Sequence, residues 1–179
     1  MGSKAKVLST RLGFRGNAFQ VTVDHVMEPG GVKARREVVR HGGSVVVLPR
    51  LDSGKVLLVR QFRYPARESL WELVAGGIEP GETPAKAAAR ELLEETGYRA
   101  RIFKPILRFF PSPGFLTEEM HLIEAAGLAK GQAEPEEDER ISTRAFTRAE
   151  LEKMIDGHRI KDGKTLIGLL WLFQRWPAR

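Results

Sequence analysis

Cysteine is absent from the 179-residue sequence, and so are long apolar runs. Without cysteine, disulfide bonds and thiolate metal sites are excluded, which suits a protein of the reducing cytoplasm. No apolar run approaches the ~20 residues that a membrane-spanning helix needs. The first residues, MGSKAKVLSTRLG, lack the apolar core of a signal peptide. The four histidines show no metal-ligand spacing. We therefore expect a cytoplasmic protein without a membrane anchor.

The composition is that of an ordinary folded domain with a basic surface. Hydrophobic residues make up 42% and charged residues 29% of the chain, and a chain of this length suits one domain with a full core. The net charge of +6 indicates either a nucleic acid or an anionic small molecule as a partner. The basic residues are scattered and lack an aromatic-basic RNA-binding pattern, so a small anionic substrate explains them equally well.

Residues 4–40 predict an antiparallel meander of two or three strands. Polar and apolar residues alternate from Phe19 to Val26, which indicates a half-buried strand. Turn residues at 15–17 and 28–31 divide the segment into hairpins. Because a hairpin layer is marginal by itself, the meander favours packing against a partner subunit.

The rest of the chain predicts strands and helices of one mixed α/β sandwich. The apolar runs 43–49 and 55–63 are expected to pair through the turn at 52–54 and to be covered on both faces. A capping box of Thr147 and Glu150 opens a predicted helix that ends at Asp156. Further elements are expected as strands at 101–110, 119–125 and 141–146, and as a final helix at 161–174.

The segment from Gly76 to Tyr98 is predicted to be a glycine-rich turn that feeds a short helix. Thr83 suits the N-cap, and Pro84 suits the first helical position because its missing N–H costs nothing there. Gly97 suits the end of the helix as a C-cap glycine. At 100° per residue, one side of the helix is predicted to face the core. That side carries Ala85, Ala88, Ala89, Leu92 and Thr96.

Three glutamates, Glu91, Glu94 and Glu95, gather on the flank of this predicted helix. Like charges at this spacing each cost roughly 0.2–0.5 kcal/mol, and the last turn of a helix favours cations instead. A departure from local rules is expected where a ligand compensates for it. Hard carboxylate oxygens indicate Mg²⁺ or Mn²⁺. The alternative is a solvated acidic face paired with Arg90 and Lys86.

The spacing of this segment resembles the signature of a known family. Gly76, five residues, Glu82, seven residues and then Arg90-Glu91-Leu92-x-Glu94-Glu95-x-Gly97-Tyr98 match every fixed position of the Nudix box. The sequence therefore resembles a Nudix hydrolase. The resemblance implies a Nudix α/β/α sandwich with a mixed sheet, preceded by the N-terminal meander. It also implies hydrolysis of a nucleoside diphosphate linked to another group, with Mg²⁺ held by the box glutamates.

Flanking features resemble the ADP-ribose pyrophosphatase branch of that family. Pro113 follows Tyr98 by fifteen residues, as in that branch. The approach to the box, the tail 157–166 and Glu-x-Glu-x-Ile at 137–141 are similar as well. We expect residues 1–40 to form a dimerisation and nucleotide-contact domain, and residues 41–179 to form the hydrolase domain.

The resemblance also assigns roles to individual residues. It implies metal ligands, namely the backbone carbonyl of Ala75 and the side chains of Glu91, Glu95 and Glu139. It implies Glu137 as the base that activates water, with Glu136 as the alternative, Glu94 as a carboxylate of variable role and Arg90 as the partner of the glutamates. It implies substrate contacts by Arg36, Glu37, Gly114 and Glu118. Arg63 suits phosphate because its planar fork binds two oxygens at once.

The function that we expect is Mg²⁺-dependent hydrolysis of ADP-ribose to AMP and ribose 5-phosphate, by a homodimer. The first alternative is a pyrophosphatase for another nucleotide sugar, such as GDP-mannose. The second, from a different class, is an RNA-binding or regulatory Nudix protein. The intact glutamates argue against that class, and so does the lack of an appended helix-turn-helix segment.

Overall fold

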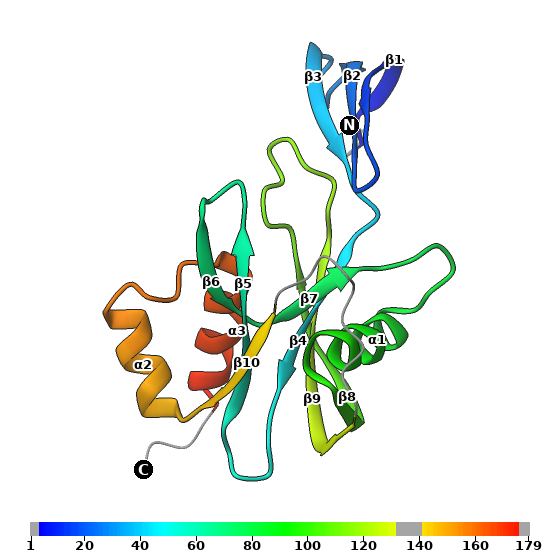
Figure 1. The fold of residues 1–179 in the computed structure, drawn as a ribbon. Helices are drawn as coiled ribbons and strands as arrows, with labels where there is room; N and C mark the ends of the chain where they lie inside the picture. Colours follow the sequence, from blue (N-terminus) through cyan, green and yellow to red (C-terminus); the bar gives the residue numbers. More distant parts are fainter. Residues whose placement is uncertain (1–3, 132–140, 176–179) are drawn as a thin grey trace. The chain divides into compact units, whose positions relative to one another are not determined.

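The computed structural model describes residues 4–131 and 141–175. Within these residues the chain forms two compact units (Figure 1). One unit, called the N-terminal unit, contains the chain up to Gly43 together with Phe109–Glu119. The other, called the box unit, contains Ser44–Arg108 and the chain from Met120 onward.

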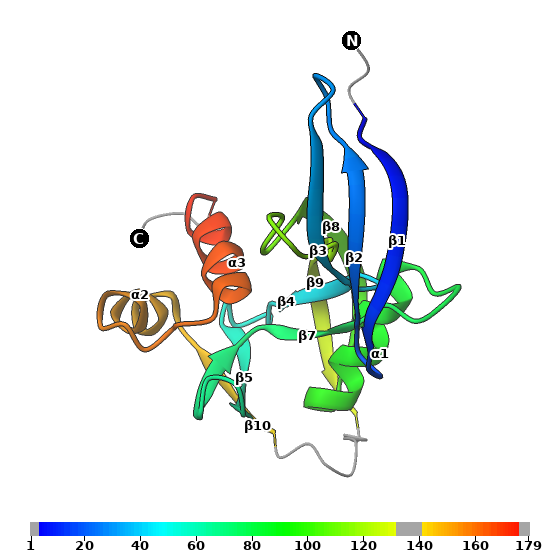
Figure 2. The same ribbon diagram turned by 90° about the horizontal axis from the view of Figure 1, so that it is seen from above.

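The N-terminal unit is built on a three-stranded antiparallel sheet, as the alternation in the sequence predicts. Its order is β1-β2-β3, with β1 at Lys6–Arg15, β2 at Gln20–Met27 and β3 at Lys33–Arg40 (Figure 2). Both connections are tight turns, and Gly30 and Gly31 have the positive φ angles that the second turn requires. The predicted meander is therefore confirmed.

Many apolar side chains of this sheet remain exposed. Only the middle strand has a buried side, made by Thr22, Asp24 and Val26. An exposed apolar patch of this kind is typical of an interaction surface. Its members on the three strands and their turns are Val7, Leu8, Leu12, Phe14, Phe19 and Val32.

The box unit contains a mixed four-stranded sheet of order β7-β4-β9-β8. The central strand β4, Ser44–Pro49, is buried along its whole length. It pairs antiparallel with β7, Val74–Gly77, and parallel with β9, Met120–Lys130. The edge strand β8 covers Tyr98–Phe109. Together with the three helices, this sheet gives the mixed α/β class that the sequence predicts.

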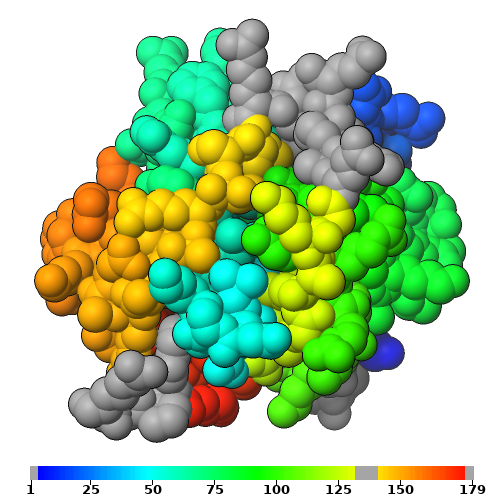
Figure 3. Space-filling model, turned by 60° about the horizontal axis from the view of Figure 1, so that its bottom comes forward, coloured from blue at the N-terminus to red at the C-terminus, as the bar shows by residue number. Residues whose placement is uncertain are grey.

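A second, antiparallel sheet of the box unit has the order β10-β5-β6. Its strands are β5 at Val56–Arg63, β6 at Glu68–Glu72 and β10 at Ser142–Phe146. The predicted pairing of β4 with β5 is wrong, because the two strands belong to different sheets and share only the bridge between Arg50 and Val56. The turn that joins them reaches the surface, where Figure 3 shows it in cyan.

Three helices complete the box unit: α1 at Pro84–Thr96, α2 at Arg148–Asp156 and α3 at Gly163–Phe173. Thr147 and Glu150 form the predicted capping box of α2. Asp162 caps α3, so this helix begins two residues later than predicted. No helix among the described residues is long and apolar enough to span a membrane.

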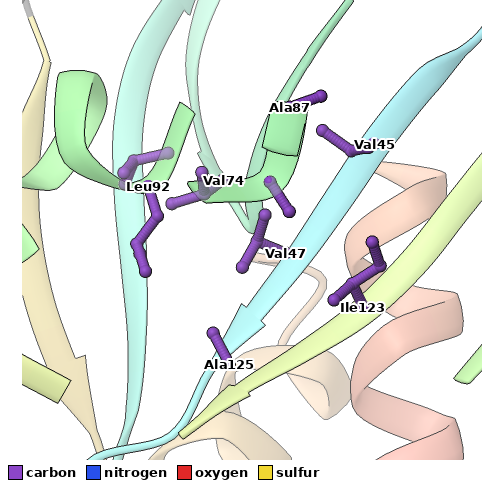
Figure 4. Close-up of a cluster of buried hydrophobic side chains, with 9 residues drawn as sticks. Val45, Val47, Val74, Ala87, Leu92, Ile123 and Ala125 are labelled. Carbon is purple, nitrogen blue, oxygen red and sulfur yellow. The ribbon is translucent and has the colours of Figure 1, made fainter. Parts of the chain in front are cut away.

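The core of the box unit lies between α1 and the mixed sheet. Ala87, Ala88 and Leu92 of α1 pack against valines of β4 and β7 and against Ile123 of β9 (Figure 4). The helix is rotated from the predicted face, because Ala85 and Ala89 are exposed, whereas Ala87 and Glu95 are buried. The alanines fit either face equally well, so the apolar pattern alone did not determine the rotation.

Candidate active site

The box helix begins and ends where its sequence predicts. The Thr83 side chain caps the first turn by accepting a hydrogen bond from the Lys86 N–H. At the other end, Gly97 has the left-handed φ of 71° and donates its N–H to the Leu93 carbonyl at 2.8 Å. Glycine adopts this conformation without the strain that a side chain adds. Both ends of α1 are thereby fixed relative to the glycine turn and β8.

Gly76 lets the backbone of β7 approach the carboxylate of Glu91. A Cβ atom at position 76 would lie 2.0 Å from both Cδ and Oε1 of Glu91, far inside van der Waals contact. Only glycine therefore fits here with Glu91 in its present place. The Glu91 carboxylate of α1 thus lies directly against the backbone of Gly76 in β7, and this close contact is called the cradle.

Arg90 connects the glycine turn to the box helix. Its Nε and Nη2 donate to the two carboxylate oxygens of Glu82 at 3.2 and 3.0 Å. Its Nη1 donates to Glu91 at 2.7 Å and to Glu94 at 3.2 Å. Nη2 also donates to the Gly77 carbonyl at 2.9 Å. One planar cation therefore holds three carboxylates, as the prediction of an Arg90–glutamate pairing requires.

The same contacts set the ionisation of this cluster. Hydrogen bonds from Arg90 lower the pKa of Glu82, and the Glu79 N–H adds to the effect. Hydrogen bonds to Glu82 likewise raise the pKa of Arg90 above its ordinary value. The same contacts thus favour the ionised forms of both Glu82 and Arg90.

The donor chemistry of α1 fits a hard divalent cation. The side chain of Glu91 is 12% exposed and that of Glu94 is 30% exposed, whereas the whole Glu95 residue is 7% exposed. Carboxylate oxygens held in place near a backbone carbonyl are the ligands that Mg²⁺ and Mn²⁺ take. The described ranges 4–131 and 141–175 contain no group of three or more His, Cys, Asp or Glu side chains already placed to hold a metal ion. The predicted ligand Glu139 and the predicted base Glu137 lie outside these ranges.

Arg63 belongs to a second charge network, on the joint between β6 and β7. Its Nε and Nη2 each donate to one oxygen of Glu72 at 2.9 Å. The ammonium of Lys164 contacts the same carboxylate and lies 2.9 Å from Asp162. The Glu72 side chain is 1% exposed, while that of Arg63 is 40% exposed. Arg63 is therefore anchored at one edge and open at the other.

Electrostatic effects link this network to the box helix. Burial is the largest influence on Glu72 and opposes its ionisation, but the contacts with Arg63 and Lys164 outweigh it and lower the pKa of Glu72. The hydrogen bond to Glu72 raises the pKa of Arg63, and the negative charge of Glu95 adds to that rise. Arg63 thus lies close enough to Glu95 of α1 for the charge of that carboxylate to act on it.

The other predicted substrate residues belong to the N-terminal unit. Arg36 pairs with Glu28 at 2.8 Å, and Glu37 pairs with Arg35 at 2.6 Å. Glu118 lies 3.6 Å from Nδ1 of His41. Gly114 lies in an exposed turn of the same unit. The structure therefore groups Arg36, Glu37, Gly114 and Glu118 in one unit, and the box residues with Arg63 in the other.

Sequence reasoning missed four members of the second network: Glu72, Asp162, Lys164 and Thr165. Asp-x-x-Thr at the start of an apolar helix is a signal for an N-cap, and Asp162 does accept hydrogen bonds from the N–H and Oγ1 of Thr165. No sequence signal indicates that Lys164 reaches Glu72, because the two residues lie 92 positions apart.

Comparison with known proteins agrees with this geometry. The model of the NUDIX domain matches residues 40–166. This range covers more than half of the chain and contains the whole turn and helix described above. The chain therefore belongs to the Nudix family, and the box cluster described above is its hydrolase signature.

Individual relatives place the chain more closely within that family. The ADP-ribose pyrophosphatase of Bacillus subtilis (strain 168) is 36% identical over 169 residues, covering 93% of this chain and 91% of that protein. The methanol dehydrogenase activator of Bacillus methanolicus is 38% identical over the same length and coverage. An ADP-ribose pyrophosphatase of Mycobacterium tuberculosis is 35% identical over 140 residues, covering 77% of this chain and 68% of that protein. The resemblance to the ADP-ribose pyrophosphatase branch is thereby confirmed.

A solved structure shares the same fold. The crystal structure of an ADP compounds hydrolase superposes with a TM-score of 0.82, covering 96% of this chain and 94% of that chain. The two sequences are only 20% identical, so the likeness concerns the fold. It confirms the predicted Nudix architecture.

Proposed function

We propose that this protein hydrolyses the pyrophosphate bond of ADP-ribose to AMP and ribose 5-phosphate, with Mg²⁺ or Mn²⁺ as cofactor. The observation that supports the proposal most is the set of carboxylates that Arg90 and Gly76 hold against β7. The names of the Bacillus subtilis and Mycobacterium tuberculosis relatives support ADP-ribose as the substrate.

The metal site in this proposal consists of the Ala75 carbonyl, Glu91, Glu95 and Glu139. A divalent cation bound there neutralises charge on the pyrophosphate and polarises its phosphorus–oxygen bonds. Gly76 supports the assignment of Glu91, since it lets this carboxylate rest against the strand that carries Ala75. Arg90 keeps Glu91 and Glu94 oriented without neutralising them fully.

Proton transfer in this proposal belongs to Glu137, which takes a proton from the attacking water. Glu94 supports that water or the metal. Arg63 binds a phosphate oxygen with the edge of its guanidinium that faces away from Glu72. Arg36 and Glu37 contact the nucleotide, and Gly114 and Glu118 contact the terminal ribose.

A hydrolysis panel tests the substrate. Purified protein with Mg²⁺ is offered ADP-ribose, GDP-mannose, ADP-glucose, NADH and diadenosine polyphosphates, and the products are separated by ion-exchange chromatography. We expect ADP-ribose to give the highest kcat/KM, with AMP and ribose 5-phosphate as products. A higher value for GDP-mannose or another nucleotide sugar would assign the protein to that substrate instead.

The name of the Bacillus methanolicus relative makes a regulatory role the second candidate, from a different class. A purely regulatory protein turns over no member of the panel, with Mg²⁺ or Mn²⁺. RNA binding is tested by an electrophoretic mobility shift assay of the protein with RNA at physiological salt, because weak charge-driven binding is lost as salt rises. We expect turnover and no shift.

We also propose a homodimer in which the N-terminal sheet contacts the second copy. The exposed apolar side chains on that sheet, such as Leu12 and Phe14, support this assembly. Light scattering on an eluting size-exclusion peak measures the mass. Co-refolding of Arg36→Ala with Glu95→Gln then tests a shared site, since only a mixed dimer contains one site with both residues native. No recovery of hydrolysis despite confirmed mixed dimers would assign the nucleotide pocket to a single chain.

A further inference from the structure

The N-terminal half of α3 touches the joint between β6 and β7 at three places. Lys164 contacts the carboxylate of Glu72, the last residue of β6. Oγ1 of Thr165 accepts the N–H of Leu73, the residue between the strands, at 2.8 Å. A Cβ atom at Gly168 would lie 2.5 Å from Cδ1 of Leu73. The helix thus meets the joint by charge, by hydrogen bond and by close packing.

Lys164 acts on Arg63 through a shared carboxylate. Glu72 receives both guanidinium nitrogens of Arg63 from one side and the Lys164 ammonium from another. The Lys164 side chain is only 10% exposed, so water cannot readily replace it as a partner of Glu72. With both oxygens of Glu72 occupied, the plane of the Arg63 guanidinium has one preferred orientation.

Thr165 acts on the backbone of the joint. It is fully buried at 0% exposure, and it donates its hydroxyl proton to Asp162 at 2.6 Å while accepting the N–H of Leu73. This hydrogen bond satisfies a backbone N–H that lies between two strands of different sheets. Leaving a buried N–H without an acceptor is costly. The position of Leu73 is therefore fixed from α3.

β7 connects Leu73 to the box helix α1. Val74 follows Leu73 directly, and its strand continues through Ala75 to Gly76, where the backbone touches the Glu91 carboxylate. The strand therefore lies between two helices, with α3 against its beginning and α1 against its end. A displacement at Leu73 would therefore also shift the backbone at Gly76, where it meets Glu91.

We propose that Lys164 and Thr165 are positioning residues that hold the joint between β6 and β7. Lys164 orients the guanidinium of Arg63 toward phosphate. Thr165 holds β7 in place against the metal-binding carboxylates of α1. The inference rests on the proposed pyrophosphatase activity and names residues outside the Nudix box that this activity needs. Neither residue touches the substrate in this proposal.

The first test removes the charge of Lys164. In Lys164→Met, we expect the KM for ADP-ribose to rise roughly tenfold with kcat nearly unchanged, because weaker phosphate binding affects ground state and transition state alike. Lys161→Met is the matched control, since Lys161 pairs with Glu68 at 2.9 Å on the exposed surface and should leave KM unchanged. A lower melting temperature with the parent KM, measured where circular dichroism shows a folded protein, would overturn the role of Lys164.

A double-mutant cycle shows whether Lys164 acts through Arg63. In the Arg63→Ala background, Lys164→Met should change KM less than about twofold, because the group that Lys164 positions is gone. Additive effects on KM would mean that Lys164 acts on the substrate by another route, and would contradict the proposal.

Thr165 gives a test that needs no turnover. Thr165→Val keeps the shape of the side chain but loses the hydroxyl, so we expect the Mn²⁺ dissociation constant measured by electron paramagnetic resonance to rise severalfold. Thr165→Ser restores the hydroxyl and should restore the affinity. Equal Mn²⁺ affinity in all three proteins would overturn the role of Thr165. If the parent hydrolyses no ADP-ribose, the proposed function fails, whereas the Mn²⁺ comparison still decides the role of Thr165.

Discussion

The box unit contains two charge networks of opposite design. In one, a single cation, Arg90, holds three carboxylates, those of Glu82, Glu91 and Glu94. In the other, a single carboxylate, that of Glu72, is held by two cations, Arg63 and Lys164. The Arg90 side chain is 27% exposed, whereas that of Glu72 is 1% exposed.

The difference lies in which charge is in excess among these contacts. At Arg90, three carboxylates meet one guanidinium, and carboxylate oxygens are ligands that a divalent cation takes. Charges around Glu72 cancel once Asp162 is counted with Lys164. A balanced buried network stabilises one geometry. We therefore propose that the first network holds the metal, and that the second holds Arg63 in the orientation that its proposed phosphate contact needs.

The largest expected effect is the loss of a box carboxylate. Glu91→Gln and Glu95→Gln should each reduce ADP-ribose turnover to near the detection limit while the protein stays folded. Each variant loses one negative charge of the cluster, and Glu91→Gln also weakens the contact with Arg90, so circular dichroism checks that each variant is folded. Glu152→Gln in α2 is the control, since Glu152 pairs with Arg148 at 2.7 Å away from the box. Turnover within a few-fold of the parent would make the cluster a strained acidic surface only.

Glu137 extends the comparison to a group outside both networks. Glu137→Gln should lower turnover by roughly 10²–10⁴-fold, the usual contribution of a positioned general base, with little change in the Mg²⁺ concentration needed for activity. Glu139→Gln should instead raise that concentration. Steady-state kinetics over a Mg²⁺ series measures both. A larger loss of turnover in Glu136→Gln would show that the base lies one residue earlier.

A smaller effect is expected when Arg90, the cation that holds Glu82, Glu91 and Glu94, is replaced by lysine. Arg90→Lys keeps the charge but loses the planar fork that reaches Glu82, Glu91 and Glu94 together. We expect turnover to fall by roughly 10–100-fold, with a higher Mg²⁺ requirement. Arg148→Lys on α2, where Arg148 pairs with Glu152 and lies over the Phe173 ring, should behave like the parent. If Arg90→Lys is equally active, a point charge suffices and the orientation of the carboxylates is unimportant.

The smallest expected effect concerns stability and its dependence on pH. The pKa of folded Glu72 lies below its ordinary value of 4.5, so the unfolded chain binds more protons in the acidic range between the two values. The contribution of Glu72 is therefore complete above about pH 4.5 and is lost as the pH falls through the folded pKa. Glu72→Gln should reduce the free energy of unfolding at pH 7 by roughly 2 kcal/mol, and the gap to the parent should shrink in acid.

Urea unfolding at several pH values measures this gap. Glu68→Gln is the matched control, because Glu68 pairs with Lys161 on the surface, and exposed pairs contribute only ~0–1 kcal/mol. A constant gap between Glu72→Gln and the parent from pH 7 to pH 3 would contradict the lowered pKa.

Local signals in the sequence predicted the elements well, because each depends on neighbouring residues. Thr83, Gly97 and the capping box of Thr147 bound their helices through contacts with residues three or four positions away. Pairing between distant segments was less predictable. The apolar runs of β4 and β5 fit one sheet or two equally well, and the choice depends on where β9 and β10 insert.

The candidate site shows the same division. The box carries its own spacing, so Arg90 and its glutamate partners were predictable from the sequence. The partners of Arg63 were not, because Glu72 and Lys164 meet only after β5, β6 and α3 have packed. Alanines on both sides of α1 also hid which side faces the core, so Ala87 and Glu95 were missed as buried residues.

The strand order of the box unit sets a sequence of events during synthesis of the chain. β4 needs β9 as its parallel neighbour, and β5 needs β10, so both early strands keep an open edge until much later residues appear. Pairings this far apart in the chain form slowly, and open edges favour aggregation. The N-terminal strands, in contrast, pair with their neighbours in the sequence and need no later residues. A nascent chain stopped before Met120 could pair β4 with β7 and β5 with β6, but the other edge of each early strand would still be open, and there a chaperone has most to protect.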